Sequence, residues 1–481
     1  MKMPQRTRRQ FLETTLLAAA AAVVPCPAPA AGPDTTSPND RVTVAVLGCG
    51  IRGKQHAEAL TGLDECDIAW VCDPDLTRAR AVAAYIASKG RRTPRTEKDL
   101  RKVLDDKSVA AVFIATPNHW HALAAIWAMQ AGKDVYVEKP VSHNITEGRR
   151  IVQTARRLGR ICQGGTQNRS NQALAEAVGY MREGKLGEVS LARSVVFRPR
   201  ESIGGPGHYP IPETVDYNLW AGPAPMSPLT RPQFHYDWHW FWSTGCGELG
   251  NNNIHSLDVC RWGLGVTGLG KSVLSYGGRL GYSDAGETPN TQVVIYDFGG
   301  RTIVAETRGL KSVPILAKMS EGWLFYGTKG IIAGTSLFDL DGKLVSTFSG
   351  KNESHFGNFL QAVRSRKTSD LHAEILEGHQ STALCHTGNI SYRLGGPASP
   401  EAISQTLAQL KVHDNVAETF DRTLKHLADN KVDPANARLT LGRLLRPDSM
   451  EERFVDCAEA NALLTRDYRA PFVVPREKDV L

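Results

Sequence analysis

Short runs of apolar residues alternate with longer amphipathic stretches over the first third of the chain. The runs at residues 42–46, 68–72, 110–115 and 134–137 are bounded by Gly, Pro or polar residues. Runs of this length and composition are typical of strands that are buried on both faces. Because helix-length stretches separate them, the pattern predicts an α/β fold with a doubly wound parallel sheet.

Two of the intervening stretches predict helices, at residues 54–60 and 119–131. Thr116 and Asn118 precede the second helix, and Lys139 follows the last of the four strands. These side chains fall at the carboxyl ends of predicted strands, where doubly wound sheets bind their ligands. We therefore expect the functional site at this edge of the sheet.

The pattern changes in the second half of the chain, where paired strands replace the alternation of strand and helix. The predicted hairpins are residues 292–298 with 302–307 and residues 323–326 with 331–333; the late helices, expected to pack back on the first domain, are 358–365 and 378–394. The expected domains are 41–161 for the parallel sheet, 162–395 for a second α/β domain and 396–481 for a helical extension without identifiable chemistry.

A glycine-rich turn follows the first predicted strand. Gly48 permits the tight turn, Gly50 lets the backbone approach a pyrophosphate, and Gly53 allows close packing of the next helix. Asp73 ends the second strand, where an acidic side chain hydrogen-bonds the ribose hydroxyls of NAD. The turn therefore predicts NAD rather than NADP, because Asp73 would repel a 2′-phosphate, although Arg78 softens this preference. The alternative role for Asp73 is that of a turn or cap residue.

The first 30 residues resemble a twin-arginine export signal. Arg8 and Arg9 precede an alanine-rich stretch too short to span a bilayer, and Ala28-Pro29-Ala30 offers a cleavage site. Residues 31–40 are rich in Pro, Thr, Asp and Ser and are expected to form a linker. Since this route carries folded proteins, we expect a periplasmic or otherwise exported protein with a tightly bound, recycled cofactor. The alternative is a disordered N-terminus with a chance arginine pair.

Charge and cysteine content exclude several kinds of partner. The net charge is only +7 over 481 residues, so neither nucleic acid nor, after signal cleavage, a membrane is expected as a partner. The nine cysteines show no paired C-x-x-C spacing, and several are expected to be small core residues. Folding before export fits a protein that does not depend on disulfides.

A set of motifs resembles the Gfo/Idh/MocA family of oxidoreductases over about residues 41–395. In chain order they are the glycine turn, Thr116-Pro-Asn-x-x-His121, Glu138-Lys-Pro140, Gly165-Thr-Gln-Asn-Arg169, Lys185-Leu-Gly-Glu-Val189 and Gly250-Asn251-x-x-x-His255-x-x-Asp258. The resemblance implies a Rossmann domain followed by an α/β domain with a large open, mostly antiparallel sheet, whose exposed face pairs subunits into a homo-oligomer. It implies that NAD is held by Gly48, Gly50, Ile51, Arg52, Gly53, Asp73, Arg78, Thr116, Pro117, Asn118, His121, Glu138 and Lys139.

The resemblance assigns catalysis to Lys139 and His255. The family's lysine contacts the reacting hydroxyl, where a cation stabilises alkoxide charge, and its histidine acts as acid or base. Asn251 stands where inositol dehydrogenase-like members have an aspartate, and an amide cannot take a proton. Asp258, three residues after His255, is the residue expected to orient the histidine instead. The alternatives are a solvated loop lysine and a satisfied core histidine.

A segment dense in aromatic residues lies at residues 234–242. Eight of its nine residues are aromatic or histidine, which predicts either a stacking wall for sugar rings or a packed core or interface patch. His235 and His239 have the spacing of zinc ligands on a helix, but no third ligand stands at motif spacing, so no metal is expected. The expected substrate-binding residues are Gln167, Arg169, Tyr236, Trp238, Asn251 and His255.

Taken with the resemblance, these features favour an exported NAD-dependent oxidoreductase that acts on a sugar, polyol or sugar derivative by hydride transfer. The alternative is a redox-assisted glycosidase, in which transient oxidation at C3 acidifies the C2 proton, elimination cleaves the glycoside and the hydride returns. A non-catalytic sugar-binding protein is the lesser alternative, because such a protein is expected to lose Lys139 or the glycines.

Overall fold

The computed structural model describes residues 41–479. The expected export signal at residues 1–30 and the linker at 31–40 lie outside these residues. No helix in the described part of the chain combines the length and the apolar character that crossing a membrane requires. The eight cysteines between residues 41 and 479 are all free and buried.

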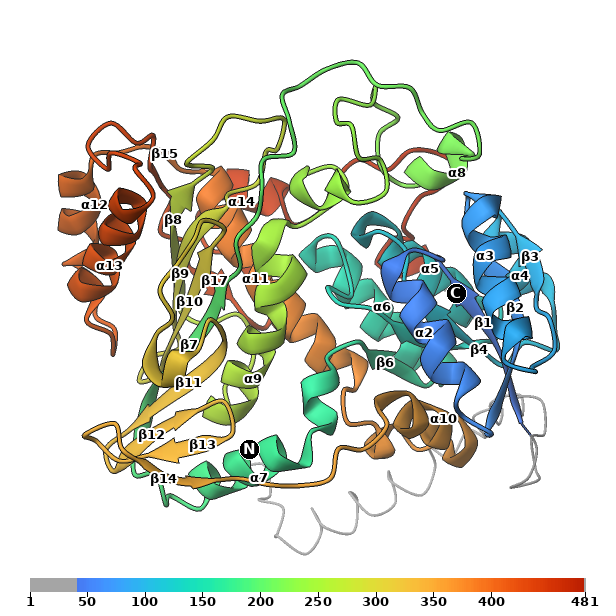
Figure 1. Ribbon diagram of the computed structural model, residues 1–481, viewed down its shortest axis with the longest axis horizontal. Helices are drawn as coiled ribbons and strands as arrows, with labels where there is room; N and C mark the ends of the chain where they lie inside the picture. The colour runs from blue at the N-terminus through green and yellow to red at the C-terminus, as the bar shows by residue number, and fades with distance from the viewer. Residues whose placement is uncertain (1–40, 480–481) are drawn as a thin grey trace, which may run out of the picture. The chain divides into compact units, whose positions relative to one another are not determined.

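A six-stranded parallel sheet forms the first domain (Figure 1), with the strand order β3-β2-β1-β4-β5-β6. Its strands are β1 (Val42–Leu47), β2 (Cys66–Cys72), β3 (Arg95–Glu97), β4 (Ala111–Ile114), β5 (Asp134–Val137) and β6 (Cys162–Gly164). Its helices are α2 (Ile51–Thr61), α3 (Leu76–Ser88), α4 (Leu100–Asp105), α5 (Asn118–Gln130) and α6 (Ile145–Leu158). This is the Rossmann order, and the predicted doubly wound sheet is confirmed. The sheet runs to Gly164, beyond the boundary expected at residue 161.

Polar residues beside the apolar runs fix the helix ends. The carboxylate of Asp75 accepts from the amide of Thr77 at the start of α3 (3.0 Å), and the side chain of Asn144 accepts from Glu147 at the start of α6 (2.9 Å). Gly159 ends α6 in the left-handed conformation that favours glycine, at φ 59°. The side chains of β4 and β5 are buried along their whole length, as expected of central parallel strands.

The second domain is built on a ten-stranded mixed sheet, ordered β14-β13-β12-β11-β7-β10-β9-β8-β16-β15. Strands β7 and β10 pair in parallel, and the other neighbours pair antiparallel. The strands are β7 (Val189–Phe197), β8 (Ser272–Gly278), β9 (Thr291–Asp297), β10 (Thr302–Arg308), β11 (Glu321–Gly327), β12 (Gly330–Ala333), β13 (Ser336–Phe338), β14 (Leu344–Thr347), β15 (Gly396–Pro397) and β16 (Thr440–Leu441). The large, mostly antiparallel sheet implied by the resemblance is therefore present.

Two helices separate this sheet from the Rossmann domain (Figure 1), α9 (Ile254–Leu264) and α11 (Ile375–Arg393). A third, α10 (His355–Ser365), packs Phe359 of the second half of the chain against Phe113 and Tyr136 of the parallel sheet. The two late helices were predicted within three residues of their observed ends. The remaining helices are α7 (Gln172–Arg182), α8 (Tyr217–Ala221), the π-helix η3 (Leu249–Asn253) and the 3₁₀ helices η1 (Gln167–Ser170), η2 (Asp237–Trp240), η4 (Leu316–Lys318), η5 (Thr368–Asp370) and η6 (Glu477–Asp479).

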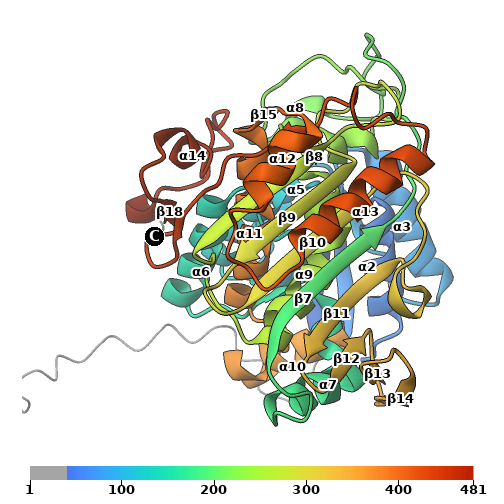
Figure 2. The same ribbon diagram turned by 90° about the vertical axis from the view of Figure 1, so that its left-hand side faces the viewer.

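The outer face of the large sheet is not open over its β8–β10 strands. Helices α12 (Pro400–Leu407) and α13 (Val416–Asp429) lie across it (Figure 2), and their apolar side chains join one buried cluster with those of the strands. The helical contributions are Ile403, Leu407, Phe420 and Leu427. The chain's own extension therefore already buries the apolar residues of these strands, and the expected pairing of subunits through the sheet stays a prediction.

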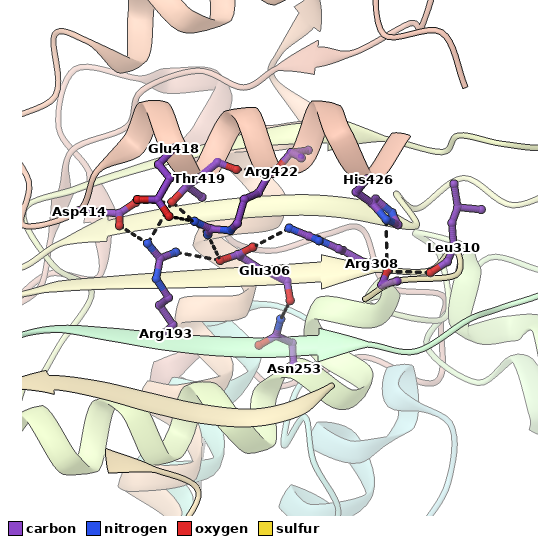
Figure 3. Close-up of polar contacts among 12 residues, drawn as sticks. Arg193, Asn253, Glu306, Arg308, Leu310, Asp414, Glu418, Thr419, Arg422 and His426 are labelled. Carbon is purple, nitrogen blue, oxygen red and sulfur yellow. Dashed lines mark hydrogen bonds and ion pairs between the residues drawn. The ribbon is translucent and has the colours of Figure 1, made fainter. Parts of the chain in front are cut away.

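A buried ionic cluster fastens α13 to the sheet (Figure 3). Glu306 of β10 is fully buried and accepts hydrogen bonds from Arg193 (2.8 Å), Arg422 (2.9 Å) and Arg308 (3.2 Å). Arg193 also pairs with Asp414, ahead of α13. Burial alone would raise the pKa of Glu306, but the three guanidinium groups lower it below its ordinary value. The carboxylate is therefore held ionised inside the protein.

The rest of the extension is not purely helical, which corrects the expectation for residues 396–481. It adds α14 (Ala458–Ala462) and the two-stranded sheet of β17 (Pro447–Asp448) and β18 (Arg453–Phe454). The C-terminal segment, residues 465–474, then returns to the Rossmann domain. There Phe472 packs edge-on against Trp120 of α5, and Arg469 donates to the carbonyls of Gly222 (3.1 Å) and Asn218 (2.7 Å).

Candidate functional site

A cavity of about 380 Å³ lies at the carboxyl ends of β1, β2, β4 and β5. One side is formed by the turns that follow these strands, and the opposite side by residues of the second domain. Of the residues expected from the sequence, it brings together Gly48, Gly50, Ile51, Arg52, Asp73, Arg78, Thr116, Pro117, Asn118, His121, Glu138, Lys139, Tyr236, Trp238 and Asn251. Gly53, Gln167, Arg169, His255 and Asp258 do not line it.

The glycine turn has the shape that a bound pyrophosphate requires. Gly48 has φ 89°, and a Cβ atom there would lie 2.6 Å from the backbone of Ala115. At Gly53 a Cβ atom would lie 1.7 Å from the carbonyl oxygen of Gly48, so only glycine lets the helix approach the turn. Gly50 precedes α2 without a side-chain cap, which leaves the helix N-terminus free to bind an anion. The residues present therefore fit a dinucleotide.

Asp73 serves the turn and lines the cavity at once. One carboxylate oxygen accepts from the amide of Cys49 (2.7 Å), and the other accepts from the amide of Asp75 (2.9 Å). Burial raises the pKa of Asp73 to about 6, against the effect of these hydrogen bonds and of Arg78. A carboxylate oxygen has more than one lone pair, so the turn-holding contact leaves capacity for ribose hydroxyls.

The buried Glu138 and the partly exposed Arg52 form a cluster on the floor of the site. Glu138 accepts from Arg52 Nε (2.7 Å), and His56 Nε2 lies 2.8 Å from the same oxygen. Burial would raise the pKa of Glu138, but the hydrogen bond from His56 and the charges of Arg52 and Lys139 lower it well below its ordinary range. Glu138 therefore carries a negative charge that positions two basic side chains beside the cavity.

His121 holds the backbone around this floor. Its Nδ1 atom lies 2.6 Å from the carbonyl oxygen of Pro140, and its Nε2 atom lies 2.7 Å from that of Thr116. Burial lowers the pKa of His121 below its ordinary value. Within the described residues the buried hydroxyl of Thr116 has no hydrogen-bond partner. The hydroxyl is thus a polar group available to a ligand in the cavity.

Lys139 joins the two domains at the centre of the site. Its Nζ atom donates to the backbone carbonyl of Asn251 at 2.5 Å. Burial lowers the pKa of Lys139, as does the charge of Arg52, while Glu138 opposes this shift. An ammonium group has three N–H donors, and the contact with Asn251 occupies one of them. Lys139 is therefore not a solvated loop lysine, which was the alternative interpretation of the sequence.

His255 lies beside the cavity rather than on its wall. It is the second residue of α9, which directly follows the π-helical turn η3 that contains Asn251. Burial, followed by the positive charge of Lys139, lowers the pKa of His255 to about 3. Within residues 41–479 no hydrogen bond to its ring is present. The π turn breaks the four-residue helical register on which the expected relation between Asn251 and His255 was based.

Asp258 does not orient His255, and Arg169 does not face the cavity. The two form a bidentate pair with each other, at 2.9 and 3.1 Å, and Asp258 also accepts from the hydroxyl of Ser381 (2.6 Å). The side chain of Arg169 is 6% exposed and that of Asp258 fully buried. Arg169 is also paired with Glu377 of α11 (3.2 Å). Both residues thus tie α9 to its neighbours, because each is the other's counter-charge.

Gln167 lies behind the floor of the site, with its side-chain oxygen toward Arg52 and its nitrogen 2.8 Å from the carbonyl oxygen of Gly165. It therefore supports Arg52 from behind. The orientation of its amide follows from these neighbours.

The aromatic segment divides between the wall of the cavity and the core. Phe234, Trp240 and Phe241 are buried at 4–7% exposure, whereas Tyr236 and Trp238 line the cavity. The segment therefore supplies both core residues and cavity-lining residues, and the stacking of sugar rings on the latter stays a prediction. His235 Nε2 is 3.1 Å from the carboxylate of Asp75, to which it hydrogen-bonds, and burial lowers the pKa of the imidazole. No three His, Cys, Asp or Glu side chains among residues 41–479 are grouped so that they could hold a metal ion.

Several cavity residues were not among the expected cofactor-binding or substrate-binding residues. They include Gln55, Lys98, Arg198, Arg200, Leu219, Trp220, His235, His239 and Asn252. Arg200 donates to Glu248 at 2.9 Å and to the hydroxyl of Tyr236 at 3.0 Å. The density of the aromatic segment was a usable signal for His239, but no local pattern marks the arginines, which reach the cavity from the end of β7.

Two family models match the chain. One, described as an oxidoreductase family with an NAD-binding Rossmann fold, matches residues 42–166. The other, described as the C-terminal alpha/beta domain of an oxidoreductase family, matches residues 207–426. Together they cover well over half of the chain and correspond to the two domains seen here.

Curated relatives match only in part. A glycosyl hydrolase family 109 protein of Shewanella pealeana is 32% identical over 174 residues, which are 32% of this chain and 38% of the relative. The scyllo-inositol 2-dehydrogenase (NAD(+)) of Bacillus subtilis is 32% identical over 149 residues, which are 31% of this chain and 42% of that enzyme. The chain thus spans less than half the length of these relatives.

A solved structure shares the fold over more of its length. The WlbA dehydrogenase from Bordetella pertussis, solved with NADH and UDP-GlcNAcA, has a TM-score of 0.57 and 21% identity and covers 73% of this chain and 97% of its own. The glycine turn, the Glu138-Lys139 floor and the two matching family models lead to one conclusion: the chain belongs to the Gfo/Idh/MocA family of NAD-binding oxidoreductases.

Proposed function

We propose that the protein oxidises a hydroxyl group of a sugar, polyol or sugar derivative with NAD. The observation that carries this proposal is the position of Lys139. Its ammonium group is fixed by Asn251 in the same cavity that contains the glycine turn and Asp73. When bound, NAD supplies the acceptor for the hydride.

The residues around Lys139 have separate roles in this proposal. Lys139 donates a hydrogen bond to the reacting hydroxyl and stabilises negative charge on its oxygen as the proton leaves. The partly buried rings of Tyr236 and Trp238 offer flat surfaces for the C–H faces of a sugar ring. Gly48, Gly50 and the N-terminus of α2 would hold the pyrophosphate, and Asp73 the ribose.

NAD is the proposed form of the cofactor rather than NADP. The carboxylate of Asp73 is buried at the end of β2, where a 2′-phosphate would meet a like charge. Arg78 also lines this end of the cavity, but its guanidinium lies 4.0 Å from the carboxylate of Asp75. Asp75 thus partly neutralises the charge that would favour a phosphate.

A redox-assisted glycosidase is the second candidate. The similarity to glycosyl hydrolase family 109 proteins, 32% identity over about a third of the chain, favours it. In that cycle the hydride returns to the same sugar, so the protein would need no second substrate to restore its cofactor. A non-catalytic sugar-binding protein is less well supported, since Lys139 and all three glycines are present.

We also propose that the protein is exported and keeps its cofactor tightly bound. The support is the twin-arginine pattern at Arg8 and Arg9, together with the eight free, buried cysteines of residues 41–479. A fold without disulfides can form in the reducing cytoplasm before export. We further propose that the protein forms a homo-oligomer, through a part of the sheet other than the outer face of β8–β10, which α12 and α13 cover.

The test is to purify the protein, denature a portion and identify any released nucleotide by mass spectrometry. The rest is incubated with glucose, galactose, N-acetylglucosamine, myo-inositol and the p-nitrophenyl glycosides of the three sugars. A stoichiometric rise in NADH absorbance with a keto-sugar or lactone product supports the oxidoreductase. Multiple turnovers of cleavage in D₂O, with deuterium at C2 and no net NADH, would establish the glycosidase. Neither outcome with any compound would contradict both enzymatic proposals.

A further inference from the structure

His239 lies on the cavity wall, and the roles described so far do not use it. It belongs to the 3₁₀ helix η2 and lines the same cavity as Lys139, whereas His255 does not. The other histidine of the aromatic segment that lines the cavity, His235, is paired with Asp75 at 3.1 Å. Among the histidines of this segment, His239 is therefore the one without an acidic partner.

A backbone contact fixes the tautomer of His239. Its Nδ1 atom lies 2.5 Å from the carbonyl oxygen of Tyr236. A carbonyl oxygen only accepts hydrogen bonds, so Nδ1 carries the proton and Nε2 carries the lone pair. Within the described residues no protein hydrogen bond to Nε2 is present. The ring thus offers an acceptor, and not a donor, to a ligand.

Packing holds this ring in place. It stacks on the indole of Trp238, with ring centres 3.6 Å apart and planes 21° apart, and the ring of Tyr236 lies at 4.9 Å. The backbone of the residue is also confined, because a Cβ atom on Gly245 would lie 2.3 Å from the carbonyl oxygen of His239. The orientation of Nε2 is therefore set before any substrate arrives.

The surrounding charges keep the imidazole neutral. Burial lowers the pKa of His239 to about 3, and the positive charges of Lys139, Arg200 and Arg231 contribute in the same direction. The hydrogen bond to Tyr236 opposes this shift without reversing it. At neutral pH the lone pair of Nε2 is consequently free, but the same shift makes the ring a weaker base, so proton transfer must accompany departure of the hydride, when the substrate oxygen becomes a carbonyl oxygen.

We propose that His239 is the base that receives the hydroxyl proton of the substrate, on Nε2, in the reaction proposed above. This inference rests on the proposed function. The O–H bond breaks as an N–H bond forms at Nε2, the carbon's C–H electron pair leaves as hydride to bound NAD⁺, and a carbonyl group remains. Lys139 stabilises the oxygen during the transfer. In this proposal His255, which lies beside the cavity, is not the base.

The experiment compares His239→Gln, His255→Gln and His208→Gln with the unchanged protein. Glutamine places an amide near the position of Nε2 but cannot take a proton, and His208 is an exposed loop histidine that supplies the matched control. Reduction of bound NAD⁺ is followed in a single turnover with whichever compound of the panel above reacts fastest. NADH binding, measured by fluorescence, reports whether each variant is folded.

We expect His239→Gln to slow reduction by roughly 10²–10⁴-fold, the range for loss of a general base. NADH binding should be unchanged in this variant, His255→Gln should lose less activity, and His208→Gln should behave as the unchanged protein. Reduction by His239→Gln at the unchanged rate would overturn the proposal. Failure of the unchanged protein with every compound is a different result, which removes the proposed function and the role of His239 with it.

A second measurement does not depend on the substrate. Nitrogen NMR of selectively labelled protein reports the tautomer of His239, and His239→Asn identifies its signal. We expect a neutral ring protonated at Nδ1 at neutral pH, with and without bound NADH. A ring protonated at Nε2, or a cationic ring, would have no lone pair for the substrate and would overturn the proposal.

Discussion

Each domain contains a buried glutamate surrounded by basic side chains, Glu138 in the first and Glu306 in the second, and the two clusters have different roles. Both are at most 3% exposed, both are surrounded by basic side chains, and both have a pKa lowered despite burial. Glu138 lies on the floor of a cavity, and its neighbours include a lysine that reaches into that cavity. Glu306 lies under α13, and its three arginines are directed at it alone or at other carboxylates.

The two clusters differ in the balance between their basic side chains and their carboxylates. Around Glu306 the charges are matched within the protein, as expected for a cluster that attaches a helix to a sheet. Around Glu138 the cations exceed the carboxylates, because Arg52 and Lys139 share one glutamate with His56. A buried site with excess positive charge suits a developing alkoxide. Charge balance therefore separates the functional cluster from the structural one, although burial alone does not.

Lys139→Ala should have the largest effect of the changes considered. We expect turnover to fall roughly 10²–10⁴-fold, because the variant loses the charge that stabilises the substrate oxygen. The free energy of unfolding should change little, since the change removes a half-buried cation from a cluster that has others. Single-turnover kinetics and urea unfolding measure the two effects. Lys185→Ala, at an exposed lysine, is the control. Normal turnover in Lys139→Ala would show that the catalytic residues lie outside the Glu138 cluster.

Glu306→Ala should have the opposite profile. Removing the carboxylate leaves the buried guanidinium of Arg308 without its carboxylate partner and takes one partner from Arg193 and Arg422, which costs about 3–5 kcal/mol of stability. Urea unfolding measures this loss. Glu418→Ala breaks an exposed pair with the same Arg422 and should cost at most about 1 kcal/mol. NADH affinity at low urea should be retained in both variants. Equal stability of the two variants would mean that the buried cluster does not fasten α13.

Asp73→Ala should weaken NADH binding by about 1.5–3 kcal/mol, the value of a charged hydrogen bond. Part of this loss will come from the turn, because Asp73 also accepts from the amide of Cys49. Asp73→Asn separates the two contributions, since it keeps an acceptor but removes the charge. We expect it to bind NADPH better than the unchanged protein does, measured by fluorescence titration. Preference for NADPH in the unchanged protein would contradict the assigned role of Asp73.

The smallest effect concerns pH. The pKa of Asp73 is raised to about 6 from its ordinary value of 3.8, so the folded apoprotein binds a proton that the unfolded chain has released between these values. Stability from this group is therefore present below about pH 4 and lost as the pH rises through about 6. NADH binding should have the opposite trend and weaken as the pH falls below about 6, because ribose hydroxyls donate to the ionised carboxylate. Titrations at several pH values test this, and in Asp73→Asn the trend should disappear.

The parallel sheet and much of the cofactor side of the cavity were predictable because their signals are local. Apolar runs define β1, β4 and β5, and the three glycines and Asp73 follow strands at fixed spacing. The predictions that were wrong concern contacts between residues that are distant in the sequence. Asp258 is 89 positions from Arg169, and nothing in either neighbourhood indicates that the two pair. The π turn at residues 249–253 likewise follows no recognised sequence pattern, yet it presents the carbonyl of Asn251 to Lys139.

The side of the cavity formed by the aromatic segment was predictable only in part. The sequence marks residues 234–242 as unusual, but it cannot divide them between wall and core, since that depends on where β7 and α8 lie. The covering of the sheet by α12 and α13 was also missed. Their residues Ile403, Leu407, Phe420 and Leu427 have helical spacing, but the surface they bury is formed by strands about 100 or more positions earlier.

The return of the C-terminal segment has a kinetic consequence. Arg469 holds the carbonyls of Asn218 and Gly222, on either side of the residues Leu219 and Trp220 that line the cavity, while Phe472 anchors the segment on Trp120. A wall fixed in this way moves only when the segment detaches, which is a local unfolding event. Under the proposed function, release of the nucleotide past this wall would then require that opening. Residues 465–474 would thereby slow nucleotide exchange, as the proposed tight binding requires.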